Sequence, residues 1–174
     1  VIISDSVNYI GDGAFSGCQS LENIELPDEL SYLGYNVFEN CNSLNYNEFD
    51  NGLYFGNSNN PYLVLMGVKN QSIESCLIHP QTKYIAPGAF YYCKSLTHIE
   101  IPGNVEKIWE RAFGECSSLI SVKLSDSVTT IGDYAFANCD SLTNVTIPNS
   151  VTTIGDYAFE NCNSLTNVII PDSV

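Results

Sequence analysis

The sequence has very little positive charge. Its 174 residues include six lysines and arginines against 20 aspartates and glutamates, which gives a net charge of −14. Because nucleic acids and anionic membranes are recognised by basic patches, this deficit argues against both as partners. All six basic residues lie within residues 69–123, so the segments on either side are purely acidic. We expect the acids to keep the chain soluble, with a basic partner at either acidic end as the alternative.

Long apolar runs and catalytic signatures are also missing. No stretch is long enough to span a membrane, and no charged-then-apolar leader opens the chain, so we expect no membrane insertion of this region. The motifs H-E-x-x-H and G-x-S-x-G and glycine-rich phosphate loops are absent. The two histidines, His79 and His98, are not part of any motif with a nucleophile. We therefore expect no enzyme, no cofactor and no metal site.

The sequence does contain a repeat of 23 residues. Six phenylalanines, each followed three positions later by a cysteine, mark its frame: Phe15, Phe38, Phe90, Phe113, Phe136 and Phe159. Only the interval from Phe38 to Phe90 departs from the period, because its 52 residues are two periods plus six. A unit this short cannot bury its apolar side alone, so the repeats are expected to stack as coils of a solenoid.

The last complete repeat shows what one coil should look like. Leu165–Ile170 predicts a short strand with alternate side chains inward, and Pro171 ends it because proline has no N–H for the ladder. Val151–Ile154 adds two more inward residues, and Asp156–Cys162 predicts a helical turn. Strands of successive coils should pair in parallel as one continuous sheet. The predicted fold class is therefore an α+β solenoid, with a parallel sheet on one face and short helical turns on the other.

The regular frame lapses at about residues 47–75. Asp50–Gly56 and Tyr62–Gly67 resemble strands, and the turn-forming segment Asn57–Pro61 joins them, so we predict an inserted β-hairpin in place of one helical turn. Inserted loops on rigid scaffolds often bind ligands, whereas a purely structural hairpin is the alternative. If the hairpin binds a protein, its aromatic residues are the candidates: Tyr54, Phe55 and Tyr62.

The seven cysteines are predicted to be packing residues. Six share one repeat slot, and Cys76 replaces a valine or isoleucine of the other repeats. A column of side chains cannot converge on a zinc ion, and thiols that point the same way do not favour disulfides. Asp12, Asp133 and Asp156 recur beside glycine, where we interpret them as helix caps rather than calcium ligands.

The repeat pattern L-x-x-I-x-I-P-x-x-V-x-x-I-G-x-x-A-F-x-x-C-x-S closely resembles the BspA-like leucine-rich repeats of bacterial and protozoan surface proteins. The resemblance covers all but about residues 50–72. It implies a leucine-rich-repeat solenoid in an extracellular, secreted or surface-attached protein, often one that adheres to proteins of a host or a neighbouring cell. It also implies that an inserted hairpin can be a structural feature of the family.

Residues 1–174 are interpreted as a single array that is cut at both ends, because Val1–Val7 and Val168–Val174 occupy the same phase of the repeat. Solenoids usually bind through the exposed side of their strand sheet. Most outward strand positions in the last repeats are threonine or asparagine. Candidate protein-binding residues are the outward positions that differ: Glu25, Tyr46, Glu48, His98 and Glu100.

Two functions remain open at this point. The leading hypothesis is a non-enzymatic module that binds a protein ligand through its sheet and hairpin. The alternative is a purely structural spacer within a larger surface protein.

Overall fold

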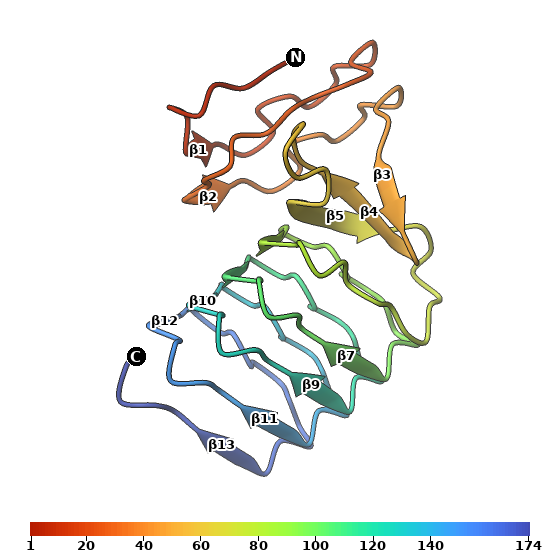
Figure 1. Ribbon diagram of the computed structural model, residues 1–174. Helices are drawn as coiled ribbons and strands as arrows, with labels where there is room; N and C mark the ends of the chain where they lie inside the picture. Colours follow the sequence, from red (N-terminus) through yellow and green to blue (C-terminus); the bar gives the residue numbers. More distant parts are fainter.

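The structure is a computed structural model that describes all residues from Val1 to Val174. It is a solenoid of stacked coils with thirteen short strands and no helix (Figure 1). Each regular 23-residue repeat forms one coil with a strand, a shorter second strand and a turn segment. Residues that occupy the same repeat slot therefore lie in columns along the solenoid.

From residue 98 onward, the first strand of each coil belongs to a four-stranded parallel sheet, called here the first sheet. Its order is β13-β11-β9-β7. The middle residue of a strand points inward and its two neighbours point outward, as with buried Val122 between Ser121 and Lys123. This alternation agrees with the prediction. The four strands are β7 (His98–Glu100), β9 (Ser121–Lys123), β11 (Asn144–Thr146) and β13 (Asn167–Ile169).

The two-residue strands of the coils join β3, β4 and β5 in a second, mixed sheet, which was not predicted. It has seven strands in the order β12-β10-β8-β6-β5-β4-β3, of which the last three are antiparallel to one another. Its strands are β3 (Asn47–Phe49), β4 (Gly52–Phe55), β5 (Val64–Val68), β6 (Tyr84–Ile85), β8 (Lys107–Ile108), β10 (Thr130–Ile131) and β12 (Thr153–Ile154). A separate two-stranded sheet pairs β1 (Tyr9–Ile10) with β2 (Tyr32–Leu33).

The predicted single continuous sheet is wrong. In the first coils the corresponding strand positions form only one isolated bridge, between Ile2 and Glu25. Residues 73–78 form no strand at all. The break lies where β3, β4 and β5 enter as a three-stranded antiparallel meander, which adds one strand to the predicted hairpin. Because β3 pairs with β4 instead of with the next coil, the first sheet cannot extend past this point.

The predicted helical turns are also wrong. Tyr134 and Asn138 have φ angles of 53° and 58°, and left-handed residues cannot continue a right-handed helix. The backbone amides of this segment donate alternately to the next coil and to their own coil. Phe136 N–H donates to the Ala158 carbonyl of the next coil at 2.8 Å, whereas Ala137 N–H donates to Tyr134 within its own coil at 3.0 Å. The segment is thus a series of tight turns that bonds neighbouring coils, so the fold is a β-solenoid rather than α+β.

The recurring aspartates do not cap helices. Asp133 Oδ1 accepts the backbone N–H of Asp156 in the next coil at 2.8 Å, and Asp12 Oδ1 accepts that of Tyr35 at 2.9 Å. Each carboxylate therefore links two coils. The carboxylate–amide interaction foreseen by the cap interpretation is present, but its donor is 23 residues away in sequence instead of two or three.

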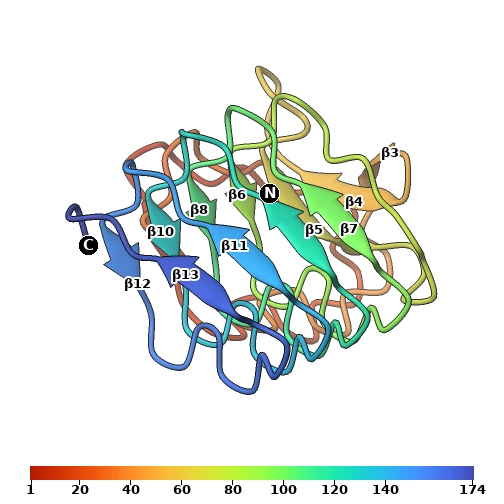
Figure 2. The same ribbon diagram turned by 90° about the horizontal axis from the view of Figure 1, so that it is seen from below.

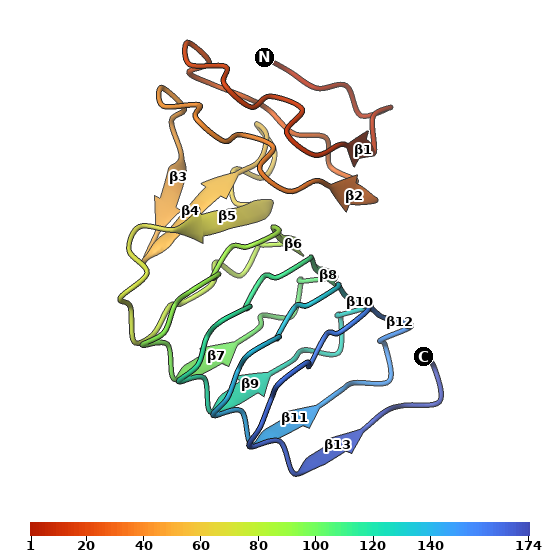
Figure 3. The same cartoon turned by 180° about the vertical axis from the view of Figure 1, so that it is seen from behind.

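The meander divides the solenoid into two stacks, the N-terminal stack (residues 1–46) and the C-terminal stack (residues 69–174) (Figures 1 and 3). Two apolar cores, of 15 and 29 buried residues, lie on either side of the meander, and the smaller one also includes Tyr84, Ala86 and Trp109 of the C-terminal stack. Adjacent residues of the meander face opposite cores: Phe55 and Val64 join the smaller core, whereas Tyr54 and Leu65 join the larger one. The meander is therefore a layer that is buried on both faces.

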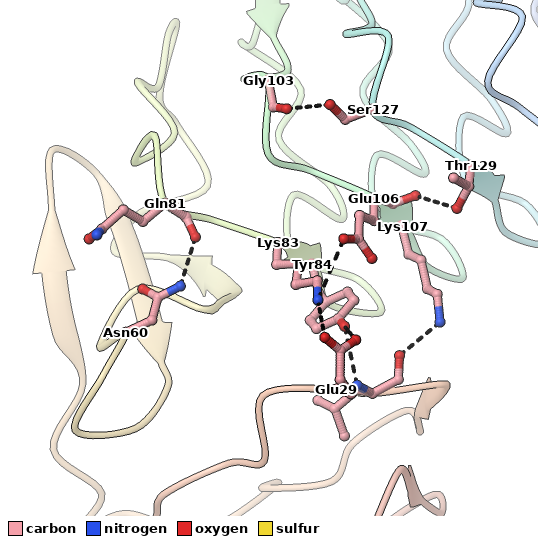
Figure 4. A network of polar contacts seen from close by, with 11 residues as sticks. Glu29, Asn60, Gln81, Lys83, Tyr84, Gly103, Glu106, Lys107, Ser127 and Thr129 are labelled. Carbon is pink, nitrogen blue, oxygen red and sulfur yellow. Dashed lines mark hydrogen bonds and ion pairs between the residues drawn. The ribbon is translucent and has the colours of Figure 1, made fainter. Parts of the chain in front are cut away.

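A polar network holds the N-terminal stack against the second sheet (Figure 4). Lys83 Nζ lies 2.6 Å from Glu29 Oε1, and the Tyr84 hydroxyl donates to the same carboxylate at 3.3 Å. That hydroxyl also accepts the Leu30 N–H at 3.2 Å, and Lys107 Nζ donates to the Leu30 carbonyl at 2.8 Å. We call these contacts the inter-stack clamp. They join residues more than 50 positions apart in sequence.

Candidate binding surface

Strands β7, β9, β11 and β13 of the first sheet lie side by side (Figure 2), so their outward side chains form two rows that run across the coils. Strand alternation places every second side chain on this face. One row carries the first residue of each strand and the other carries the third: His98, Ser121, Asn144 and Asn167, and Glu100, Lys123, Thr146 and Ile169.

A trough of about 490 Å³ lies between the two rows at the end of the sheet nearest the meander. We call it the sheet-face trough. Ser75, His98 and Ser121 line one side of it, and Leu77, Glu100 and Lys123 line the other. Leu77 is 69% exposed, so an apolar side chain projects at this rim. The sequence contains the signal for it, because leucine occupies an outward slot that Glu48, Glu100 and Lys123 fill in the neighbouring coils.

An ion pair crosses between two strands at the trough. Lys123 Nζ lies 2.5 Å from Glu100 Oε1, and both side chains are largely exposed. An exposed pair contributes ~0–1 kcal/mol to stability, so both groups remain free to exchange partners. His98 is exposed on the same strand as Glu100. The structure thus brings together two of the predicted binding residues, His98 and Glu100, beside a lysine and a leucine.

The other predicted acidic residues lie elsewhere. Glu25 belongs to the N-terminal stack, where its only strand partner is Ile2. Glu48 lies on β3, and its carboxylate is 2.7 Å from Lys69 Nζ. Because the first sheet is interrupted between these positions and β7, Glu25, Glu48 and Glu100 do not form the predicted acidic row.

The predicted aromatic residues are mostly internal. Tyr54 is fully buried and Phe55 is 2% exposed, so neither presents its ring to a partner. The Tyr54 hydroxyl accepts the His79 N–H at 3.1 Å, and burial raises its pKa to about 12. Tyr62 is half-buried and stacks on His79 with ring centroids 3.8 Å apart. The burial of Tyr54 and Phe55 corrects their prediction as surface contacts, whereas Tyr62 stays a candidate.

Tyr46 lies at a second depression, in a cleft of about 260 Å³ between the two stacks. Its ring stacks on Phe55 with centroids 4.4 Å apart and is 37% exposed. Burial raises the pKa of its hydroxyl. Met66 and Pro87 also line this cleft. Sequence reasoning does not find it, because its walls come from two stacks whose contact follows no repeat.

The cysteines line the core. Cys116 and Cys139 are fully buried, and each thiol donates to a phenylalanine carbonyl of the preceding coil at 3.2 Å. Burial raises the pKa of Cys76 to about 12 and that of Cys93 to about 11, which keeps both thiols protonated at neutral pH. Cys18 is the exception, since it is exposed. No three acidic, histidine or cysteine side chains converge in a way that could hold a metal ion.

The sequence of the chain is similar to the BspA type leucine rich repeat region, which matches in six copies over residues 1–59 and 68–174. The unmatched residues 60–67 lie within the meander. No protein of curated function matches the chain significantly. The structure contains no helix that is long and apolar enough to cross a bilayer.

The fold is similar to that of solved bacterial proteins. A leucine rich cell surface protein from Faecalibacterium prausnitzii is 30% identical, with a TM-score of 0.71 over 98% of this chain and 47% of that one. The pneumococcal vaccine antigen PcpA is 22% identical, with a TM-score of 0.68 over 99% of this chain and 51% of that one. At that lower identity PcpA supports the fold alone. The chain spans about half the length of these two relatives.

Proposed function

The chain belongs to the BspA-type leucine-rich-repeat family, and from that premise we propose that it is a non-enzymatic, protein-binding region of a cell-surface or secreted protein. Support for this location comes from the 30% identical Faecalibacterium protein, which is described as a cell surface protein. Support for a binding role comes from the general use of solenoid sheets as binding surfaces. The proposed role applies to residues 1–174 and not to a whole surface protein.

The sheet-face trough is the observation that carries the proposal. It combines exposed Leu77 with three polar residues, His98, Glu100 and Lys123. These three lie on β7 and β9, whose backbones pair with each other. Binding interfaces typically surround an apolar anchor with polar groups on a rigid support. The remaining rows toward β13 offer mainly small polar side chains, which makes the trough the most distinctive part of this face.

The charge of the chain indicates the sign of the partner. With a net charge of −14, the protein attracts a basic surface more readily than an acidic one. Long-range attraction between exposed charges weakens with ionic strength. We therefore expect added salt to slow association with the partner.

The test uses beads coated with the purified chain and cultured epithelial cells, before and after trypsin removes the cell-surface proteins. We expect beads to attach to untreated cells and to lose attachment after trypsin. Combining Leu77→Ser with His98→Ala should lower the apparent affinity roughly tenfold, as loss of an interface anchor does. The matched control combines Asn144→Ala with Thr146→Ala on the same sheet. If attachment survives the trough substitutions to the same extent as the control substitutions, the proposal is contradicted.

A structural spacer is the second candidate. The small polar outward side chains Asn144, Thr146 and Asn167 favour it, because a surface that binds nothing needs only solubility; Ile169 is the apolar exception among them. A spacer predicts that coated beads attach no better than uncoated ones, at any salt concentration. The same bead experiment therefore separates the two functions.

A further inference from the structure

The first sheet stops at β7, although another coil lies beside it. β7 pairs with β9 and is the last strand of the sheet. The adjacent segment Glu74–Ile78 occupies the strand slots of its coil but forms no strand. One backbone bond joins the two, from Thr97 N–H to the Glu74 carbonyl at 3.2 Å. Beyond it, no backbone hydrogen bond links residues 76–78 to residues 98–100.

The backbone groups that this break leaves unpaired follow from strand geometry. Ile101 N–H donates to the Lys123 carbonyl at 2.9 Å, so the backbone of Ile101 faces β9. Successive residues of a strand direct their N–H and C=O groups to opposite sides. The Glu100 N–H and the His98 carbonyl therefore face away from β9, and neither has a hydrogen-bond partner in the protein. β7 thus has a free edge within the solenoid.

The meander ties the neighbouring segment away from this edge. Asp50 Oδ2 accepts the Leu77 N–H at 2.7 Å, and Asn51 Nδ2 donates to the Ser75 carbonyl at 3.2 Å. The Tyr54 hydroxyl takes the His79 N–H. Side chains of the meander thereby bond backbone groups of residues 75–79 that face away from β7. The insertion fixes the neighbouring segment from the side opposite the free edge.

The surroundings of the edge suit an extended chain. The sheet-face trough of about 490 Å³ lies along it, and Leu77 is exposed at its rim. Glu74 and Glu100 are exposed acids on the two sides of the opening. Lys123 pairs with Glu100, whereas no cation lies within ion-pair distance of Glu74. An incoming segment would therefore meet an apolar contact and an unbalanced negative charge.

We infer that β7 is a docking edge for an extended segment of a partner protein, which adds as a strand, covers Leu77 with an apolar side chain and places a basic side chain near Glu74. Unpaired strand edges are ready templates for such addition, in which main-chain bonds supply affinity and alternate side chains supply specificity. The inference rests on the proposed protein-binding function and names the form of the ligand.

The test uses the peptide acetyl-Val-Lys-Val-Thr-Val-Lys-Val-amide and amide-resolved NMR of the full chain. We expect the Glu100 amide to exchange with solvent at least ~10-fold more slowly when peptide is bound, because it gains a partner. The control is the same peptide with alternate backbone nitrogens methylated, which keeps the side chains but removes main-chain donors. Equal binding of the methylated peptide would overturn the inference, because docking would then not use the strand edge.

A pair of substitutions tests the edge from the protein side. Glu100→Pro removes the free N–H, and proline is tolerated where an edge donor has no partner. We expect it to abolish peptide binding while the circular dichroism spectrum and melting temperature stay near those of the parent. Glu100→Gln keeps the N–H but removes one acid of the opening, so it should weaken binding far less than Glu100→Pro does. Binding that survives Glu100→Pro contradicts the inference.

Two further results separate this inference from the proposed function. If cell attachment persists in Glu100→Pro but is lost in the combined Leu77 and His98 variant, the binding function stands and strand addition fails. If the chain alone dimerises at NMR concentration and protects Glu100 without peptide, the occupant is a second copy and the assignment to a partner segment is overturned.

Discussion

The phenylalanine column runs through both stacks but is built differently in each. In the C-terminal stack the rings lie nearly parallel, with centroid separations of 4.8, 5.1 and 5.3 Å along Phe90, Phe113, Phe136 and Phe159. In the N-terminal stack, Phe38 stacks on Phe15 at 5.6 Å but meets Phe55 of the meander edge-on, at 78°. One repeat slot therefore produces a uniform column only where both neighbours are regular coils.

Burial follows the same division. Phe113 and Cys116 of the C-terminal stack are fully buried, whereas Phe38 is 8% and Cys41 7% exposed in the same slots of the N-terminal stack. Each coil of a solenoid buries its apolar face only against its neighbours, so an irregular neighbour leaves gaps. The comparison teaches that the repeat sequence specifies which residues face inward, and that the neighbours decide how well they are covered.

The largest effect should come from truncating the phenylalanine column. Phe113→Ala removes a fully buried ring and should lower the free energy of unfolding by ~3–5 kcal/mol. Phe15→Ala should cost clearly less, because that ring is only partly buried. Urea denaturation of the two variants measures the difference. Equal losses would break the comparison between the stacks.

Thiol reactivity should divide the cysteines in the same way. At mildly alkaline pH, a thiol whose pKa is raised from 9.0 to about 11, as burial does for Cys93, has a thiolate fraction ~100-fold smaller. Cys18 is exposed, so we expect one rapidly reacting thiol in the native chain. A disulfide reagent with optical readout measures this, and all seven thiols should react in denaturant. Fast reaction of Cys93 in the native protein would contradict the buried column.

The inter-stack clamp should loosen one stack without unfolding the other. Tyr84→Phe leaves the Leu30 N–H without its hydroxyl partner and should cost ~1–3 kcal/mol. Hydrogen exchange should rise in residues 24–44 and stay unchanged in residues 113–145. Tyr134→Phe, in a tyrosine pair stacked on the turn segments, is the control. A uniform rise along the chain would mean that the stacks do not open separately.

The smallest effect concerns the charge of Glu29. The hydrogen bond from Lys83 lowers the pKa of this carboxyl below its ordinary value of 4.5. A carboxyl group whose pKa is lowered by folding stabilises the protein at pH values above its unfolded-state pKa. That stability is lost as the pH falls through its folded-state pKa. Because the Glu29 side chain is 72% exposed, we expect only ~0.2–1 kcal/mol.

Melting temperatures of the parent chain and Glu29→Gln measure this effect. The two should differ at neutral pH and converge as the pH falls through the lowered pKa of Glu29. Asp126→Asn, at an exposed position of the C-terminal stack, is the control and should show no comparable convergence. A gap between parent and Glu29→Gln that persists in acid would mean that the clamp does not depend on this charge.

Sequence reasoning recovered the features that repeat. Leu142, Val145 and Phe136 are buried in the slots assigned to them, and Cys139 packs in the core as expected. It misjudged the turn segments, because Ala-Phe-x-x-Cys spacing is equally compatible with one helical turn and with tight turns. Left-handed φ at Tyr134 distinguishes the two, and tyrosine carries no sequence signal for that conformation.

The candidate surface was only partly predictable. His98 and Glu100 follow from strand alternation, which depends on local geometry alone. Tyr54 and Phe55 could not be placed, since adjacent residues of one strand face different cores and an aromatic pair looks the same in either orientation.

The 23-residue period by itself determined the solenoid, its inward columns and the outward rows, because each of these depends on contacts that recur at a constant separation. Only the tertiary structure decided where the first sheet ends, which backbone edge stays free and how the two stacks meet. Those features depend on single contacts such as Asp50 with Leu77 and Glu29 with Lys83, which join distant residues outside the repeat. A pattern can specify what it repeats, whereas contacts made once become visible only when the chain is folded.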